Sequence, residues 1–75
     1  MKTFKKTIKG YSVEVETEID GDPSTECWVE KGSFSASFNS LGQTGVLTSN
    51  DGERELIISQ DAFDAIEKWA ESVGW

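Results

Sequence analysis

The chain contains the stretch Tyr11-Ser-Val-Glu-Val-Glu-Thr-Glu-Ile-Asp20, in which carboxylates alternate with mostly apolar or β-branched residues. Side chains of a β-strand point alternately to its two faces, so a strand here would bury Val13, Val15 and Ile19 and align the acids on the other face. Successive carboxylates would then lie about 6.6 Å apart, at a rise of about 3.3 Å per residue. The row consists of Glu14, Glu16, Glu18 and Asp20. We expect this row to face a cation, a basic partner or only water.

Three X-Gly dipeptides predict tight hairpin turns, because glycine supplies the positive φ that such turns require. They are Lys9-Gly10, Lys31-Gly32 and Asp51-Gly52. The runs on either side predict antiparallel strands near 2–8, 11–19, 25–30, 33–39, 45–49 and 53–58. Residues 20–24 and 39–45 are rich in Gly and polar turn formers, so we expect them to be loops that join the hairpins.

The middle turn can be tested by pairing residues across it. A two-residue loop at Lys31-Gly32 separates two faces cleanly. The inner face then pairs Val29 with Phe34, Cys27 with Ala36 and Thr25 with Phe38, and the outer face pairs Glu30 with Ser33, Trp28 with Ser35 and Glu26 with Ser37. The sequence therefore predicts that Trp28 points outward, between two glutamates.

The other two turns give less distinct faces. A hairpin at Lys9-Gly10 pairs Ile8 with Tyr11 and Phe4 with Val15 inside, and Lys5 with Glu14 outside, but places Lys6 opposite Val13. One long strand with a bulge at Gly10 is the alternative. The turn at Asp51-Gly52 pairs Leu47 with Leu56 and Thr48 with Glu55, while Val46 and Ile57 are apolar on the second face.

A C-terminal helix is expected over residues 60–73. Ser59 is a suitable N-cap, Asp61 lies in the first turn, and Gly74 follows the last helical residue. The residues at helical spacing that would face the sheet are Ala62, Phe63, Ile66, Trp69, Ala70 and Val73. The predicted fold is thus a single α+β domain over 1–75, an antiparallel sheet of five to six strands with one helix packed on one face.

One helix of about 14 residues is only about 21 Å long and about 10 Å wide, less than six strands spaced by about 4.8 Å require. We therefore expect either a strongly curled sheet or a second subunit that completes the burial. Trp75 is expected to pack back beside Trp69.

Composition restricts the function classes. The 75 residues include one cysteine, Cys27, which cannot form an internal disulfide and favours a reducing, cytoplasmic setting. The lysine-rich start is not followed by an apolar stretch, so we expect neither export nor membrane insertion. Histidine is absent, which removes the commonest general base and metal ligand. We expect no enzyme activity, no catalytic residues, no metal and no cofactor.

Charge is distributed unevenly. The formal net charge is −7, yet residues 1–9 carry four lysines and no acid, while residues 10–75 hold all fourteen acids and three basic residues. An acidic body repels phosphate backbones, so direct nucleic-acid binding is disfavoured except through the lysine cluster of residues 1–9.

The acidic row continues on the next strand around the outward Trp28. Carboxylates spaced along a strand resemble the phosphates of one nucleic-acid strand, and such a surface would fit a cationic groove. The predicted partner-binding residues are Glu14, Glu16, Glu18, Asp20, Glu26, Trp28 and Glu30. The alternative is the solvated outer face of a one-sided sheet, partly balanced by Lys5, with the Trp28 ring lying flat on its neighbours.

Two further segments are weak candidates. Asp20-Gly-Asp22-Pro-Ser24-Thr-Glu26 has oxygen donors at alternate positions, but it lacks the glycine of a calcium loop and has Lys31 where a bidentate glutamate is needed. Gly42-Gln-Thr-Gly45 lacks the lysine of a phosphate-binding loop. Both are interpreted as ordinary connections.

In size, acidity and its sheet-plus-helix pattern the chain is similar to small acidic phage-encoded inhibitors of host defence systems, among them DNA mimics and anti-CRISPR proteins. The resemblance implies a phage- or mobile-element-encoded protein that blocks a basic groove of a nucleic-acid-handling host complex. It rests on no motif, so no functional residue is carried over. The alternative is a small structural or assembly protein that forms a homodimer through an apolar sheet surface. Salt should weaken the first kind of association steeply and the second little.

Overall fold

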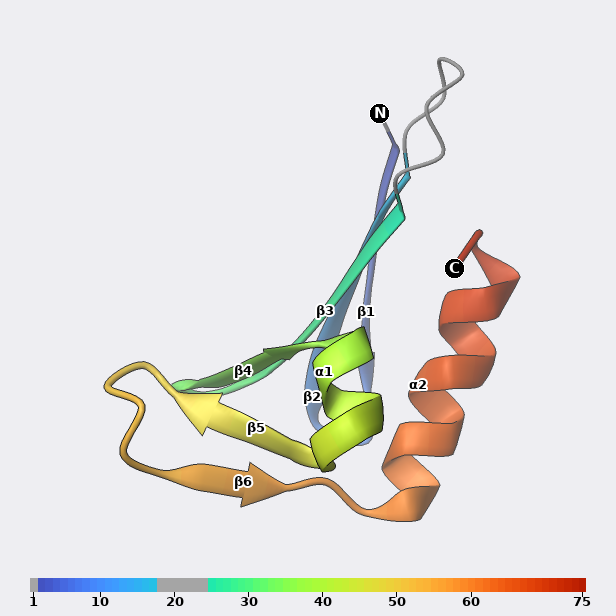
Figure 1. The fold of residues 1–75 in the computed structure, drawn as a ribbon. Helices are drawn as coiled ribbons and strands as arrows, with labels where there is room; N and C mark the ends of the chain where they lie inside the picture. The colour runs from blue at the N-terminus through green and yellow to red at the C-terminus, as the bar shows by residue number, and fades with distance from the viewer. Residues whose placement is uncertain (1, 18–24) are drawn as a thin grey trace.

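The computed structural model describes residues 2–17 and 25–75, which form a six-stranded antiparallel sheet and two helices (Figure 1). The strands follow one another in chain order across the sheet. The elements are β1 (Lys2–Ile8), β2 (Tyr11–Thr17), β3 (Thr25–Lys31), β4 (Phe34–Ser37), α1 (Phe38–Thr44), β5 (Val46–Ser49), β6 (Glu55–Ile57) and α2 (Gln60–Ser72). The predicted α+β fold is confirmed, with one helix more than the sequence indicated.

The first hairpin has the predicted register. Ile8 pairs with Tyr11, and Lys5 with Glu14, so no bulge occurs at Gly10. Lys9 and Gly10 both have positive φ, 50° and 86°, as a two-residue type I′ turn requires. This turn matches the right-handed twist of the strands and holds Lys5 beside Glu14.

The second hairpin is displaced from its predicted register by two residues. Val29 pairs with Ala36, and Trp28 with Ser37, so the predicted partners Phe34 and Ser35 were wrong. The turn residues are Gly32 and Ser33, because Gly32 takes the positive φ of 61° at the first turn position while Lys31 remains in β3. A shift of two preserves the faces, so Trp28 still points outward as predicted.

The third hairpin has the predicted pairs, Leu47 with Leu56 and Thr48 with Glu55. Its turn is held by Ser49, whose hydroxyl donates to the Asp51 carboxylate and accepts from the Arg54 N–H at 3.1 Å. The Asp51 carboxylate also accepts from the Glu53 N–H at 3.0 Å. These bonds close the turn before β6, which is therefore shorter than predicted.

The segment predicted as a loop at 39–45 is instead the helix α1. The Ser37 hydroxyl caps it by accepting from the Ser40 N–H at 3.3 Å. Gly45, with φ 70°, ends it and donates its N–H to the Leu41 carbonyl at 2.8 Å. Phe38 and Leu41, three residues apart on one helix face, are 5% and 1% exposed. Burial of these two side chains explains why a glycine-containing segment is helical.

The helix α2 begins and ends as predicted. The Ser59 hydroxyl accepts from the Ala62 N–H at 3.3 Å, and Gly74 follows the last turn with φ 113°. Ala62, Ile66 and Ala70 are buried on the face toward the sheet. The aromatic rings of Phe63 and Phe38 stack at 5.0 Å between centroids, which joins α2 to α1. Trp75 packs edge-on against Phe38, with 5.7 Å between ring centroids, in agreement with its predicted return to the core.

The core is completed both by sheet curvature and by α1. In Figure 1 strands β1 to β3 run steeply, whereas β4 to β6 lie across them, and both helices lie on the concave side. Only two residue pairs join β4 to β5. Valines 13, 15 and 29 are fully buried between sheet and helices. The apolar inner face is therefore covered within one chain, which removes the need for a second subunit to complete it.

In the part of the chain described here, no helix is long and apolar enough to cross a membrane.

Candidate partner-binding surface

The outer face of the sheet, defined as the face away from both helices, brings the predicted acids together with Trp28. Strand pairing aligns them in rows that run across β1 to β4. One row is Lys5, Glu14, Trp28 and Ser37, the next is Ser12, Glu30 and Ser35, and a third is Thr3, Glu16 and Glu26. Their inward neighbours Val13, Val15, Cys27 and Val29 are buried, which fixes the orientation of the whole face. The predictions for Glu18 and Asp20, and for Asp22 and Ser24 of the calcium-like segment, lie outside the described residues.

Glu14 is the acid of the one ion pair within residues 2–17 and 25–75. Lys5 Nζ lies 3.5 Å from Glu14 Oε2, and the two side chains are 69% and 34% exposed. An exposed pair of this kind contributes only about 0 to 1 kcal/mol to stability. It shows that the row of carboxylates already attracts a cation from the neighbouring strand.

Glu16 and Glu26 face each other on β2 and β3, and neither forms an ion pair among the described residues. Hydrogen bonding to the Glu14 carboxyl group raises the pKa of Glu16, and burial and the negative charges of Glu14 and Glu26 raise it further. The charge of Lys5 acts in the opposite direction. Like charges directly opposite in a sheet destabilise it, so this part of the fold carries unrelieved negative charge.

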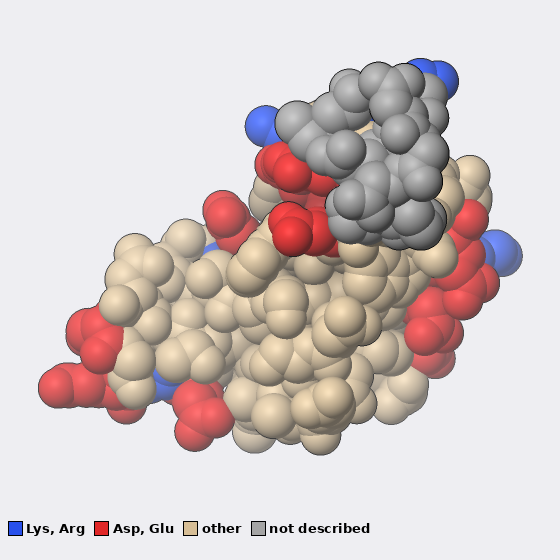
Figure 2. Space-filling model, turned by 45° about the horizontal axis from the view of Figure 1, so that its top comes forward, with Lys and Arg blue, Asp and Glu red and all other residues tan. Residues whose placement is uncertain are grey.

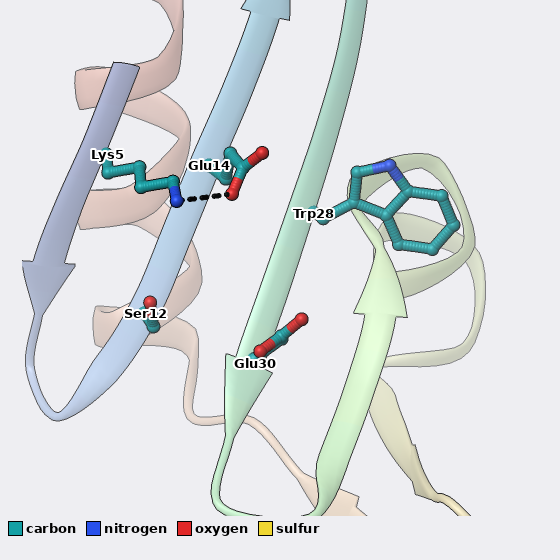
Figure 3. A pocket seen from close by; sticks show the side chains of 5 residues that line it. All are labelled: Lys5, Ser12, Glu14, Trp28 and Glu30. Carbon is teal, nitrogen blue, oxygen red and sulfur yellow. Dashed lines mark ion pairs between the residues drawn. The ribbon is translucent and has the colours of Figure 1, made fainter. Parts of the chain in front are cut away.

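A hollow of about 280 Å³ opens on the outer face beside these residues. Lys5, Ser12, Glu14, Trp28 and Glu30 line it (Figure 3). Ser12 pairs with Glu30 and lies two residues from Glu14 on β2. Its short side chain is therefore surrounded by two carboxylates and the indole. Ser12 was missed by sequence reasoning, because its position opposite Glu30 depends on the pairing of β2 with β3.

Trp28 is 45% exposed, a large fraction for an indole on a sheet. In Figure 3 the indole extends from β3 toward β4, with its broad face turned out of the sheet and the helices behind. An aromatic face presented to solvent beside carboxylates is suited to contact with a cationic or apolar group of a partner.

The basic residues of the chain's body lie elsewhere. Lys31 Nζ lies 4.7 Å from the centroid of the Tyr11 ring, and the Arg54 guanidinium 5.7 Å from that of Phe34. Both rings belong to the inner side of the sheet, since Tyr11 is buried and Phe34 contacts the core. Among the described residues, the one ion pair of the outer carboxylates on β2 and β3 is that between Lys5 and Glu14.

Negative charge also extends beyond the outer face. Figure 2 shows acidic side chains around the margins of the view and an uncharged middle. Asp64, Glu67 and Glu71 lie on α2, away from the sheet face described above. Charge alone therefore does not distinguish the outer face, and its combination with Trp28 and the hollow does.

The one cysteine of the chain, Cys27, is a free thiol buried in the core. Cys27 is 2% exposed, and burial raises the pKa of its thiol to about 11, so it remains protonated near neutral pH. Within residues 2–17 and 25–75 no three carboxylates or thiols are grouped closely enough to hold a metal ion.

No protein-family model, no curated protein and no solved structure matches this chain.

Proposed function

We propose that the protein is a stoichiometric binding protein whose outer sheet face docks on the basic surface of a protein partner. The observation that carries the proposal is the combination of an exposed Trp28 with glutamates on three sides of it, two on its own strand and Glu14 opposite. Aromatic residues with a polar rim are favoured at the centres of protein interfaces.

The partner class follows from charge complementarity. A face with one lysine among several carboxylates matches a surface rich in lysine and arginine, and such surfaces are typical of grooves that hold nucleic acid. Docking there would exclude the nucleic acid, as in inhibitors of the DNA-mimic or anti-CRISPR type. No catalytic step is part of this function, and the chain would act by occupancy.

The test compares two variants that each remove three negative charges. The first is Glu16→Gln/Glu26→Gln/Glu30→Gln on the outer face, and the second is Asp64→Asn/Glu67→Gln/Glu71→Gln on α2. Host proteins bound to a column of duplex DNA are challenged with each variant, and the released proteins are identified by mass spectrometry. We expect the wild type and the α2 variant to release the same basic protein, and the outer-face variant to release at least ten-fold less.

Two results would contradict the proposal. Equal release by the outer-face and α2 variants would mean that net charge, rather than this face, is responsible. Release that persists unchanged when ionic strength is raised from about 0.1 M to 0.5 M would exclude an ion-pair mechanism, because such contacts are screened over about 10 Å or less in this range.

A second candidate is self-association through the apolar part of the sheet. Ile57 is 79% exposed and pairs with the half-buried Val46 on β5, so the β6 edge presents an apolar side chain to solvent. Sedimentation equilibrium between about 10 and 500 µM decides this candidate. A dimer that is lost in Ile57→Ser and kept in the outer-face variant would support an assembly role.

A further inference from the structure

We infer that the hollow beside Trp28 is a subsite for one arginine side chain of the partner, which its carboxylates and indole distinguish from lysine. This inference rests on the proposed function and specifies the group that the outer face recognises. The evidence is the arrangement of four residues on the outer face, which form two successive cross-strand pairs of β2 and β3. We call this four-residue group the cell; its members are Ser12, Glu14, Trp28 and Glu30.

The first step is the position of the two carboxylates. Glu14 pairs with Trp28 and Ser12 pairs with Glu30, so Glu14 and Glu30 occupy diagonal corners of the cell. Diagonal neighbours across an antiparallel pair are about 7 to 8 Å apart. A planar guanidinium with five N–H donors can reach carboxylates on two sides at once, whereas an ammonium group is a compact point charge.

The second step concerns the other two corners. Ser12 is short and leaves the space above it open, which accounts for the hollow of about 280 Å³. This volume lies just below the range of about 300 to 1,000 Å³ of small-molecule sites, which favours a single side chain as the occupant. Trp28 also lines the hollow, and its exposed indole, which extends toward β4, supplies at that margin a flat surface on which guanidinium groups stack.

The third step is the cation already present at the edge of the hollow. Lys5 approaches Glu14 from β1 at 3.5 Å, and its side chain is 69% exposed. Glu30 has no ion-pair partner among the described residues. A partner arginine can therefore pair with Glu30 directly and share Glu14 with Lys5 or displace it.

The experiment uses fluorescently labelled deca-arginine and deca-lysine peptides, which have equal formal charge. Kd values are measured by anisotropy at about 0.15 M salt for the wild type and for Trp28→Leu, which keeps an apolar side chain and removes the indole. We expect the wild type to bind deca-arginine about 3- to 10-fold more tightly than deca-lysine, the range expected of a cation–π contact combined with forked hydrogen bonds. Trp28→Leu should reduce that preference at least two-fold, because only the forked hydrogen bonds to the carboxylates remain, while changing the Kd for deca-lysine less than two-fold.

A matched control and a direct readout keep the test decisive. Ile57→Leu alters the other exposed large hydrophobic residue and should leave the arginine preference intact. In nitrogen-15-labelled wild-type protein, the Trp28 indole N–H resonance, assigned from through-bond and through-space spectra of the wild type, should shift on addition of deca-arginine. If Trp28→Leu unfolds, this shift in the wild type decides the question, and its absence at saturation overturns the inference.

The remaining outcomes separate the inference from the function on which it rests. Equal affinity for both peptides, with binding still lost in the outer-face variant, overturns the arginine subsite and leaves the docking surface intact. Failure of both peptides to bind, or undiminished binding by the outer-face variant, overturns both.

Discussion

Glu16 on β2 lies directly opposite Glu26 on β3, and neither carboxylate forms an ion pair among the described residues. Selection for stability alone would place opposite charges or β-branched residues at such a cross-strand pair. This repulsive pair lies on the face that carries the exposed Trp28. Such a pair is expected on a surface whose counter-charge is supplied by another molecule, as proposed here.

The first prediction concerns the pH dependence of folding. The pKa of Glu16 in the folded protein lies above its ordinary value of 4.5. Between these two values the folded state binds more protons than the unfolded state, so stability should rise as pH falls through the raised folded pKa toward 4.5. Urea unfolding at unit pH steps should show this rise, measured at low micromolar concentration because the sequence pI is about 4.3. Glu16→Gln should have a flatter profile, and identical profiles would refute the assignment.

In the same series of urea unfolding experiments, the trend should reverse at lower pH, where stability should fall because Asp51 becomes protonated. Hydrogen bonds from the Ser49 hydroxyl and the Glu53 N–H lower the pKa of Asp51 below its ordinary value of 3.8. A lowered folded pKa contributes stability that is present above 3.8 and is lost as pH falls through the lowered value. We therefore expect a maximum of stability between the two regions, and Asp51→Asn should weaken the decline on the acid side.

The second prediction tests the turn that these bonds close. Ser49 is 6% exposed and joins the Asp51 carboxylate to the Arg54 N–H. Ser49→Ala removes both hydrogen bonds and should lower the free energy of unfolding by about 1 to 3 kcal/mol. Thr48→Ala, one residue away on the exposed face, should change it by less than about 0.5 kcal/mol. Equal effects of the two substitutions in urea titrations would mean that the hydrogen bonds of the Ser49 hydroxyl contribute nothing specific to the free energy of unfolding.

The third prediction tests α1 as part of the core. Leu41→Ala should lower the free energy of unfolding by about 2 to 5 kcal/mol, because the side chain is 1% exposed and its loss leaves a cavity. Gln43→Ala on the exposed side of the same helix should be neutral within about 0.5 kcal/mol. Chemical denaturation followed by circular dichroism measures both, and a neutral Leu41→Ala would show that α1 does not pack on the sheet.

The helix α1 also shows where sequence reasoning fails. The segment contains helix signals, namely an N-cap residue, an apolar pair at helical spacing and a glycine C-cap, supplied by Ser37, Phe38 with Leu41, and Gly45. Its low intrinsic helix propensity outweighs these signals, because it contains Gly42 and several poor helix formers. Burial against β3, β4 and Phe63 decides the conformation, and propensity cannot reveal that contact. In contrast, the hairpin at Lys9-Gly10 has the register read from the sequence, with Ile8 opposite Tyr11, and the alternative of a bulge at Gly10 does not occur.

For the candidate site, too, the sequence predicts one part and not the other. Alternation along β2 and β3 predicts that Glu14, Glu16, Glu26, Trp28 and Glu30 lie on one face. The hollow requires the pairing of Ser12 with Glu30, which no tight turn specifies because a longer connection joins β2 to β3. The shape of the hollow depends on the register of β2 and β3, whereas the charge of the outer face can be read from the alternation of residues along each strand.

The last prediction concerns Lys5 as an internal competitor for Glu14. If a cation of the partner enters the hollow, removal of the Lys5 charge should free Glu14 and strengthen binding. Lys5→Met should therefore lower the Kd for deca-arginine by about 2- to 5-fold, the equivalent of one exposed ion pair. Lys6→Met makes the same change in net charge one residue away, opposite Val13 on the inner side of the hairpin. Its gain should be smaller and should vanish at about 0.5 M salt, because it acts only through the long-range field. Equal gains from the two variants at both salt concentrations would show that Lys5 does not compete for the hollow, and would assign its effect to net charge alone.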